Sequence, residues 1–286
     1  MRTALILAGG SGTRLRPLSS DENPKQFLRI FDGVSLIEKT YGRVSRLMEP
    51  SSIFVSTNEQ YAPKCAAYLP TLPEVNILTE PARRNTAPAI AVCCFAIESI
   101  IEDAVIAVLS SDSYIADEDE FIRVLARAYE FAASSDYLVT IGIEPTEANT
   151  GYGYLHLGGE IASPGILRVD GFREKPSQEA ADEYLRSGGY CWNAGMFVWR
   201  AGVFRRALEA AAPEIATLAD RIVTSGDPAR RVEHYEDMPS ISIDYALMER
   251  APRVAAIRGN FGWSDVGSFE SLERVGVPVA ELLKNR

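Results

Sequence analysis

Two aspartates and three basic residues could together bind phosphate groups, the aspartates through a metal ion and the basic residues directly. Asp112 and Asp265 lie far apart in the sequence, and each follows an apolar run that predicts a strand. Arg14 offers a planar fork for phosphate, and Lys25 and Lys175 offer point charges. Mg²⁺ often takes one or two carboxylates and completes its octahedron with phosphate and water. The pattern therefore indicates metal-assisted phosphate chemistry, although Asp112 could instead cap a helix and Asp265 could hold a turn.

A glycine-rich segment at residues 8–15 directly follows the apolar run 4–7. Such a run is typical of a buried strand that ends at the carboxyl edge of a parallel sheet. Glycines lack Cβ atoms, so their backbone N–H groups can surround anionic oxygens. With Arg14 and Lys25 nearby, the first thirty residues predict a nucleotide triphosphate site. The alternative is that these glycines only form a turn.

Two better-known glycine loops do not fit this segment. A P-loop requires Lys followed by Ser or Thr after its last glycine, and no lysine stands there. The dinucleotide fingerprint requires a third glycine, and that place, counted from Gly10, is Leu15. The pattern therefore disfavours an NAD-dependent oxidoreductase.

The composition is that of a globular chain with room for a large core. The sequence has 286 residues, of which 47% are hydrophobic, enough for one large α/β domain or two smaller ones. A net charge of −10 argues against a nucleic acid or an anionic membrane as partner. No apolar stretch reaches the length of a membrane span and no signal peptide is evident, so we expect a cytoplasmic protein. The four cysteines lack metal-binding spacing, which indicates buried thiols in a reducing compartment.

The first half alternates strands with helices. Apolar runs predict strands near residues 4–7, 53–56, 75–78, 104–109 and 137–143, and helices near 36–48, 87–101 and 121–133. We therefore expect an α/β fold with a Rossmann-like, mostly parallel central sheet and helices on both faces. Ligands bind such sheets at the carboxyl ends of the strands.

The second half is less regular. Strands are expected near 151–154, 167–172, 194–199 and 254–257, with helices over about 201–249. Asn193 precedes one strand, where it could bond sugar hydroxyls or hold a turn. Lys175 precedes a proline and is expected to be extended. On a strand Glu174 and Lys175 would face opposite ways, so a shared ligand requires a turn or bulge, and the alternative is an exposed ion pair.

Five stretches together resemble the sugar-phosphate nucleotidyltransferases, and within them the mannose-1-phosphate guanylyltransferase (GDP-mannose pyrophosphorylase) branch. They are residues 7–17 with 24–28, 80–90, 172–176, 192–197 and 263–267. The resemblance covers roughly residues 3–270 in the right order. It departs from the family at Arg16, Ser111, Ser113 and Arg173, where other residues are common.

The resemblance implies the nucleotide-diphospho-sugar transferase type of fold with a small mixed sugar-binding subregion. It implies a single domain over 1–275, with a nucleotide-binding half at about 1–145 and a sugar-phosphate-binding half at 146–275. Residues 276–286 are expected to form a C-terminal tail, without the β-helix domain that many relatives carry.

The resemblance also implies roles for individual residues. The nucleotide would be held by Leu7, Ala8, Gly9, Gly10, Gly12, Thr13, Arg14, Glu80, Asn85 and Asp112. The sugar phosphate would be held by Gly153, Glu174, Lys175 and Asn193. Arg14, Lys25, Asp112, Lys175 and Asp265 would be catalytic, and Asp112 and Asp265 would bind Mg²⁺ as the cofactor.

The implied reaction joins GTP and mannose 1-phosphate to give GDP-mannose and pyrophosphate. Both substrates are small molecules, and a homodimer is expected by resemblance. Glucose 1-phosphate or a manno-configured heptose 1-phosphate remains an alternative substrate. A further alternative is that the protein is a non-catalytic, regulatory homologue that binds nucleotide sugars.

Glu80 offers a physical reason for guanine. Guanine presents N1–H and N2–H₂ as adjacent donors, and a carboxylate accepts both because it has only acceptors. Relatives with glutamine at the matching position tend to use thymine or uracil. The alternative for Glu80 is a strand-end carboxylate in solvent.

Overall fold

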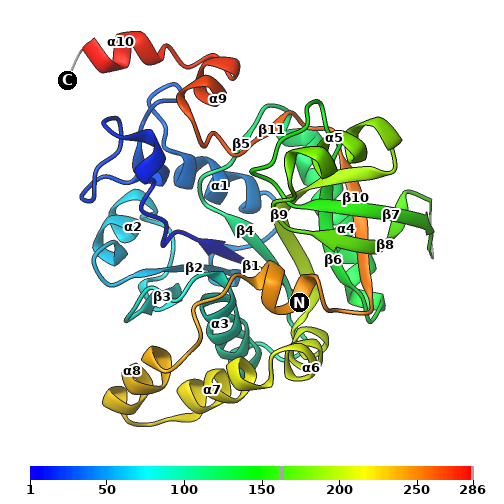
Figure 1. Cartoon of the computed structure of the whole chain (residues 1–286). Coiled ribbons are helices and arrows are strands. Elements are labelled where there is room, and N and C mark those ends of the chain that lie inside the picture. The colour runs from blue at the N-terminus through cyan, green and yellow to red at the C-terminus, as the bar shows by residue number, and fades with distance from the viewer. Residues whose placement is uncertain (162–163, 285–286) are drawn as a thin grey trace.

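A nine-stranded sheet runs through the centre of the computed structural model, which describes residues 1–161 and 164–284 (Figure 1). The strand order is β3-β2-β1-β4-β9-β6-β10-β8-β7. In this order the bounds are Ile77–Glu80, Ile53–Asn58, Arg2–Leu7, Val105–Ser110, Tyr190–Arg200, Leu138–Ile143, Val254–Gly259, Ile166–Arg173 and Tyr154–Glu160.

The first four strands are parallel, as the alternation of strands and helices predicts. Leu7 of β1 is in register with Ser56 of β2 and with Ser110 of β4. The chain segments that follow these strands therefore leave the sheet at one edge. This shared edge brings the glycine-rich loop after β1 close to Asp112, which follows β4.

Two strands reverse the sheet in the second half. β9 is antiparallel to both β4 and β6, and β8 is antiparallel to both β10 and β7. β6 and β10 return to the direction of the first strands. Among these pairs only β7 and β8 follow each other in the chain with a short connection, which an antiparallel pair permits. The sheet is thus parallel where the nucleotide half is expected and mixed beyond it.

Helices cover both faces of the sheet, as Figure 1 shows. One face packs against α1, α2 and α4, which span Leu36–Val44, Ala62–Tyr68 and Glu118–Ser134. The other packs against α3, α6 and α7, at Thr86–Ile100, Ala201–Ala211 and Pro213–Thr224, and α8 follows at Pro228–Glu236. α5 spans Gln178–Ser187. Among the described residues, no helix combines the length and the apolar character needed to cross a bilayer.

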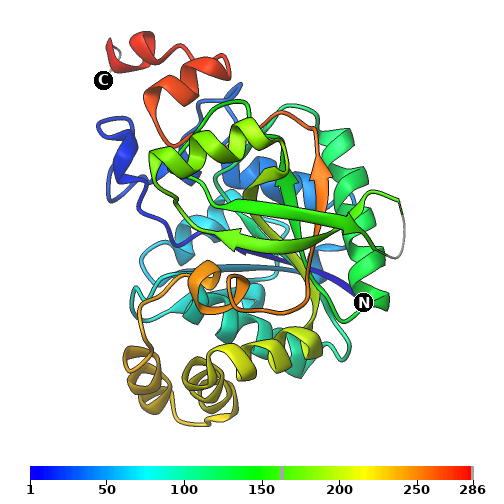
Figure 2. The same ribbon diagram turned by 45° about the vertical axis from the view of Figure 1, so that its right-hand side comes forward.

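A third apolar cluster joins the two ends of the chain. It packs the segment after β1 against α9 (Phe269–Arg274) and α10 (Val279–Lys284). Its buried members are Leu15, Leu18, Leu28, Phe31, Leu36, Val266, Leu272, Val277 and Val279. Figures 1 and 2 both show the red C-terminal helices beside the blue N-terminal segment. Of the expected tail, residues 285–286 lie outside the described residues.

Short elements complete the chain. β5 (Tyr114–Ile115) pairs with β11 (Trp263–Ser264), which draws the loop after β4 toward the loop after β10. Single turns lie at Thr13–Leu15 (η1), Lys25–Phe27 (η2), Pro50–Ser52 (η3), Glu74–Asn76 (η4) and Asp244–Met248 (η5). η5 is a π-type turn, a form often found at functional sites.

Three predicted strand bounds are wrong. The strand expected near 151–154 begins only at Tyr154 and runs to Glu160. β3 begins at Ile77 instead of Val75, because residues 74–76 form the turn η4 and Asn76 Nδ2 donates to the Ile53 carbonyl at 2.8 Å. β9 begins at Tyr190, so Asn193 lies inside the strand instead of before it. The described cysteines are free and buried, as expected.

Candidate active site

The glycine-rich loop is held by the segment that carries Lys25. Gln26 Nε2 donates to the carbonyls of Ala8 and Gly10, both at 2.9 Å. Gly12 has a φ of 61°, and a Cβ there would lie 2.7 Å from the Lys25 backbone nitrogen. Only glycine fits this approach, because a side chain would be both strained and in collision. The conformation of the glycine-rich loop therefore depends on the cationic segment that packs against it.

Lys25 joins the two aspartates. Its side chain is buried, and Nζ donates to Asp112 Oδ2 at 2.9 Å and to the backbone carbonyl of Asp265. Burial alone would raise the pKa of Asp112, but Lys25, a hydrogen bond from Ser110 and the nearby Arg14 lower it overall. The Asp112 carboxyl is therefore kept ionised beside the glycine loop.

Asp112 is not a helix cap. The next helix, α4, begins at Glu118, and its cap is Asp117, which accepts from the Glu120 backbone N–H at 2.9 Å. The acidic residues at 117–120 thus form a helix N-terminus, where the helix dipole favours negative charge.

Asp265 holds a turn and also faces the cations. Its Oδ1 accepts from Tyr152 Oη at 2.8 Å and from the Gly267 N–H at 3.2 Å. Its Oδ2 lies 3.8 Å from Arg14 Nη2. A Cβ at Gly267 would approach Oδ2 to 2.5 Å and Arg14 Nη1 to 2.8 Å, so this position favours glycine.

This donor set fits Mg²⁺. Lys25 contacts the carboxylate of Asp112 and the backbone carbonyl of Asp265, so two aspartates from distant parts of the chain lie beside one lysine. Mg²⁺ commonly binds proteins through only one or two carboxylates. Among residues 1–161 and 164–284, no three His, Cys, Asp or Glu residues gather into a larger ligand cluster. The arrangement thus suits a metal that also takes oxygens from a phosphate substrate.

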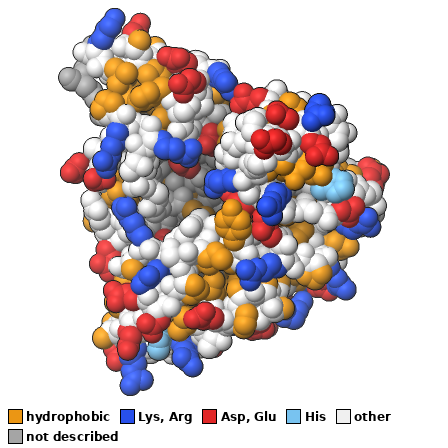
Figure 3. Space-filling model, in the orientation of Figure 1, with side chains coloured by type: hydrophobic (Ala, Val, Ile, Leu, Met, Phe, Trp, Pro, Cys, Tyr) orange, Lys and Arg blue, Asp and Glu red, His pale blue; other side chains and the backbone are white. Residues whose placement is uncertain are grey.

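A cavity of about 450 Å³ opens at the carboxyl end of the parallel strands. Six of the predicted nucleotide residues line it: Leu7, Gly9, Gly10, Glu80, Asn85 and Asp112. The space-filling view shows a hollow in the middle of the surface with Lys and Arg side chains around it (Figure 3). Ala8 is buried beside the loop, and Thr13 and Arg14 are exposed beyond it. Lys25, Gly12 and Asp265 adjoin the cavity through the contacts described above.

Asn85 shapes the far wall of the cavity. It has a φ of 69° and a ψ of −174°, a conformation that is nearly restricted to glycine. Its side chain accepts from the Thr86 N–H at 2.8 Å and so caps α3. Thr86 Oγ1 in turn accepts from the Ile243 N–H at 2.9 Å, which anchors η5 at the cavity.

Glu80 is held by two hydroxyl groups. Oε1 accepts from Ser56 Oγ at 3.0 Å, and Oε2 accepts from Tyr235 Oη at 2.6 Å. Burial raises the pKa of Glu80 more than these two hydrogen bonds lower it. The alternative of a strand-end carboxylate in solvent is therefore wrong.

Glu174 and Lys175 meet at a turn after β8. Lys175 Nζ donates to Glu174 Oε1 at 2.7 Å. Lys175 has a φ of 43°, so the expectation of extended backbone before the proline is wrong. The left-handed backbone at Lys175 forms a turn. This turn allows the side chains of Glu174 and Lys175 to face the same ligand, which they could not do on a regular strand. The hydrogen bond that Lys175 donates to Glu174 is the main cause that raises the pKa of Lys175.

Gly153 and Asn193 lie beside this pair. The Gly153 carbonyl accepts from the Asn193 N–H at 2.8 Å, and a Cβ at Gly153 would approach Glu174 Oε2 to 2.6 Å. Asn193 Oδ1 accepts from Thr140 Oγ1 at 2.8 Å, and Nδ2 donates to Asp244 Oδ1 at 3.1 Å. The amide therefore links β9 to β6 and to η5, and its Oδ1 also accepts from the Gly195 N–H at 3.3 Å, where the pairing of β9 with β6 is irregular. Gly153, Glu174, Lys175 and Asn193 form one group.

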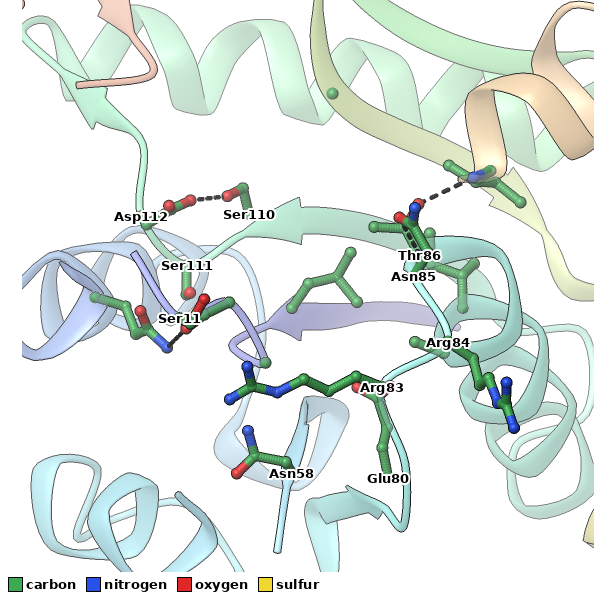
Figure 4. A pocket seen from close by; sticks show the side chains of 18 of the residues that line it. Ser11, Asn58, Glu80, Arg83, Arg84, Asn85, Thr86, Ser110, Ser111 and Asp112 are labelled. Atoms are coloured by element: carbon green, nitrogen blue, oxygen red, sulfur yellow. Dashed lines mark hydrogen bonds between the residues drawn. The ribbon is translucent and has the colours of Figure 1, made fainter. Parts of the chain in front are cut away.

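Sequence reasoning missed Asp244, Tyr235 and Arg83. Asp244 lines the cavity and links it to the Asn193 group. Burial, and then the nearby Glu174, raise the pKa of Asp244 to about 6. In Figure 4 Arg83 extends toward the loop that carries Ser11, whereas Arg84 points away. Arg83 lies in the quoted stretch 80–90, but no spacing marks Asp244 or Tyr235.

The family model described as "Nucleotidyl transferase" matches residues 3–281 of this chain. Among curated proteins, the chain is 39% identical over 277 residues to "Mannose-1-phosphate guanylyltransferase" of Salmonella muenchen, covering 94% of this chain and 58% of that relative. It is 38% identical to the Escherichia coli K12 protein of the same name, covering 97% of this chain and 60% of that relative. The chain thus spans about three fifths of the length of these curated relatives.

A solved structure shows the same fold at nearly full coverage. It is described as a "mannose-1-phosphate geranyltransferase" from Thermus thermophilus, with a TM-score of 0.87 and 34% identity. The match covers 96% of this chain and 78% of that chain. The Rossmann-like architecture expected from the sequence is thereby confirmed.

Proposed function

Because this chain belongs to the nucleotidyl transferase family, we propose that it joins GTP and α-D-mannose 1-phosphate to give GDP-mannose and pyrophosphate. One observation carries the proposal: Lys25 draws Asp112 and Asp265 together beside the glycine loop, at the cavity that Glu80 also lines. The names of the similar proteins support mannose 1-phosphate as the acceptor.

The chemistry is a direct displacement. A phosphate oxygen of the sugar 1-phosphate attacks the α-phosphorus of GTP, a new P–O bond forms, and the bond to the departing pyrophosphate breaks. No covalent enzyme intermediate is required, because the attacking group is already an anion. The protein's task is to align two anionic substrates and to neutralise their repulsion. Arg14 and Lys25 serve the nucleotide side, and Lys175 serves the sugar phosphate.

Asp112 and Asp265 would hold Mg²⁺. When bound, this ion neutralises phosphate charge during the displacement. Lys25 keeps both aspartates at the end of the glycine loop, and Tyr152 fixes the Asp265 carboxylate through its hydroxyl group.

The two groups of binding residues divide the substrates. Glu80 would accept guanine N1–H and N2–H₂ at the β3 end of the cavity. The sugar would be surrounded by Glu174, Asn193 and Gly153. Sugar hydroxyl groups donate hydrogen bonds, and carboxylate and amide oxygens can accept them. Asp244 reaches the cavity from the Asn193 group and so connects the two subsites.

The test is a pyrophosphate-release assay with GTP and mannose 1-phosphate, compared with glucose 1-phosphate and with UTP and dTTP. We expect the highest kcat/KM with GTP and mannose 1-phosphate. Asp112→Asn should lower turnover by at least about 100-fold, the scale of losing one preorganised charge contact, and should leave folding nearly intact.

Asp117→Asn is the matched control, because this aspartate caps α4 and does not line the cavity. It should leave turnover near the wild-type value. Near-normal turnover of Asp112→Asn would remove Asp112 from the site. No turnover with any sugar phosphate in the folded wild-type protein would favour a non-catalytic binding role.

A further inference from the structure

Glu80 stands on the wall between two cavities. It lines the nucleotide cavity, and it also lines a second cavity of about 460 Å³ between β3, α3, α7 and α8. Tyr235 of α8 lines only the second cavity. Glu80 therefore borders the nucleotide cavity, and Tyr235 reaches its carboxylate from the side of the second cavity.

The two hydroxyl donors come from behind this wall. Ser56 belongs to β2 and is fully buried, and Tyr235 is 2% exposed. Each donates to a different oxygen of Glu80, at 3.0 Å from Ser56 Oγ and 2.6 Å from Tyr235 Oη. A carboxylate offers about four lone-pair sites, so one remains on each oxygen. Two adjacent acceptors match the two adjacent donors of guanine.

The position of Tyr235 is fixed by its surroundings. Its ring packs in the apolar cluster that also holds Ile90 of α3 and Met238. Arg84, on the loop after β3, donates to the Glu236 carbonyl at the end of α8. Because α8 and the loop that begins at Glu80 are tied together twice, the phenol cannot shift without moving the base-binding wall.

We propose that the hydroxyl groups of Tyr235 and Ser56 position the Glu80 carboxylate to read guanine, which makes α8 a determinant of base selectivity. This inference rests on the proposed function, because it assumes that Glu80 receives the base. Tyr235 and Ser56 are positioning residues and do not touch the nucleotide. Without Tyr235 Oη, Oε2 loses its fixed direction, and the pair of acceptors no longer matches both N1–H and N2–H₂.

The experiment compares GTP with ITP, whose base keeps N1–H but lacks the 2-amino group. In Tyr235→Phe the ratio of kcat/KM for GTP to that for ITP should fall roughly tenfold, the scale of one hydrogen bond to a charged group. A ratio measured on one preparation does not depend on how much of the protein is folded. The KM for mannose 1-phosphate should stay near the wild-type value.

Tyr129→Phe is the matched control. Tyr129 is also a buried tyrosine, but its hydroxyl group donates to the Thr3 carbonyl at 2.7 Å on the opposite face of the sheet. Its substitution should leave the ratio unchanged. Ser56→Ala removes the other donor and should also lower the ratio, so it decides the question if Tyr235→Phe does not fold.

Glu80→Gln distinguishes the positioning role of Tyr235 and Ser56 from the base-binding role of Glu80. If Glu80→Gln lowers the ratio and neither Tyr235→Phe nor Ser56→Ala does, the hydroxyl groups are only a structural tether and the inference is overturned. If all three variants keep the wild-type ratio, Glu80 does not read the base, and that part of the proposed function fails with it. If all three lower the ratio, the inference holds.

Discussion

At the scale of single residues, three of the five described non-glycine residues with a positive φ lie where chemistry is expected. Asn85, Lys175 and Val266 are not glycines, yet their φ values are 69°, 43° and 38°. Positive φ is costly for such residues, and above all for a β-branched one such as Val266. Each lies beside a proposed site residue or is one. The folded protein therefore holds these segments in shapes that their own residue types disfavour.

Asp244 is a buried carboxyl group in the same region, and its ionisation is costly because it is buried. Its pKa of about 6 exceeds the usual value of 3.8 because of burial and the nearby Glu174, while Lys175 opposes the shift. Below about pH 4 the group is protonated in both the folded and the unfolded states. As the pH rises toward about 6, the unfolded chain ionises first, so this contribution to stability is lost.

Asp244→Asn should therefore leave the free energy of unfolding unchanged near pH 4 and raise it by roughly 1–3 kcal/mol above pH 6. Urea unfolding at a series of pH values measures this difference. Asp182→Asn, on the exposed side of α5, is the control and should follow the wild-type curve in parallel. A constant difference for Asp244→Asn across the whole range would contradict the assignment.

At the scale of elements, the site residues lie on loops that follow the strands, and contacts between these loops fix their positions. The glycine loop after β1 depends on η2, because Gly12 lies directly against Lys25. β5 and β11 pair across the ends of two loops and bring Asp112 and Asp265 to the same lysine. The contacts between loops therefore fix the site as firmly as the sheet does.

Gly12→Ala tests this dependence. The new Cβ would meet the Lys25 backbone nitrogen at 2.7 Å in a left-handed conformation, so η2 must move. We expect turnover to fall by at least about 100-fold and the free energy of unfolding to drop by roughly 1–3 kcal/mol. Chemical denaturation and the pyrophosphate assay measure the two effects.

Gly10→Ala is the stability control, since a Cβ there meets nothing within 4 Å and the φ of Gly10 is not positive. Its free energy of unfolding should stay within about 0.5 kcal/mol of the wild-type value. Equal destabilisation by both alanines would argue against a specific contact between Gly12 and Lys25.

At the scale of the whole molecule, the third apolar cluster couples the chain's two ends to the nucleotide loop. Leu15 follows Arg14 directly, and it packs in the same cluster as Leu272 of α9. α9 and α10 therefore support the loop that would bind the nucleotide, although neither helix lines the cavity.

Leu272→Ala should lower the free energy of unfolding by about 2–5 kcal/mol, because Leu272 is fully buried. It should also raise the KM for GTP, since the loop that carries Arg14 loses support. Leu208→Ala in α6 removes an equally buried leucine on the far face and should cost similar stability without raising this KM. The same KM in both variants would disprove the coupling.

Much of this architecture could be predicted from the sequence, because apolar runs and glycines are local patterns that indicate strands, helices and turns. The strands at 53–58 and 105–110 and the helix at 86–100 lie within two residues of expectation. The site residues were predicted through motif resemblance and strand ends, and their roles stay predictions. The backbone of Lys175 and the hydrogen bonds of Asn193 depend on tertiary contacts, which no local pattern encodes. Long-range packing brings Asp244 to the nucleotide cavity and Tyr235 to Glu80, so nothing in their sequence neighbourhood marked either residue.

The hydrogen bond from Lys25 to the carbonyl of Asp265 joins positions 240 residues apart. A ribosome must therefore release almost the whole described chain before these two positions can meet. Any shorter nascent product lacks one of the proposed metal-binding carboxylates, whatever its own secondary structure. Turnover should consequently emerge abruptly once Asp265 has left the ribosome, which makes enzymatic activity a sensitive reporter of the long-range contact between these two positions.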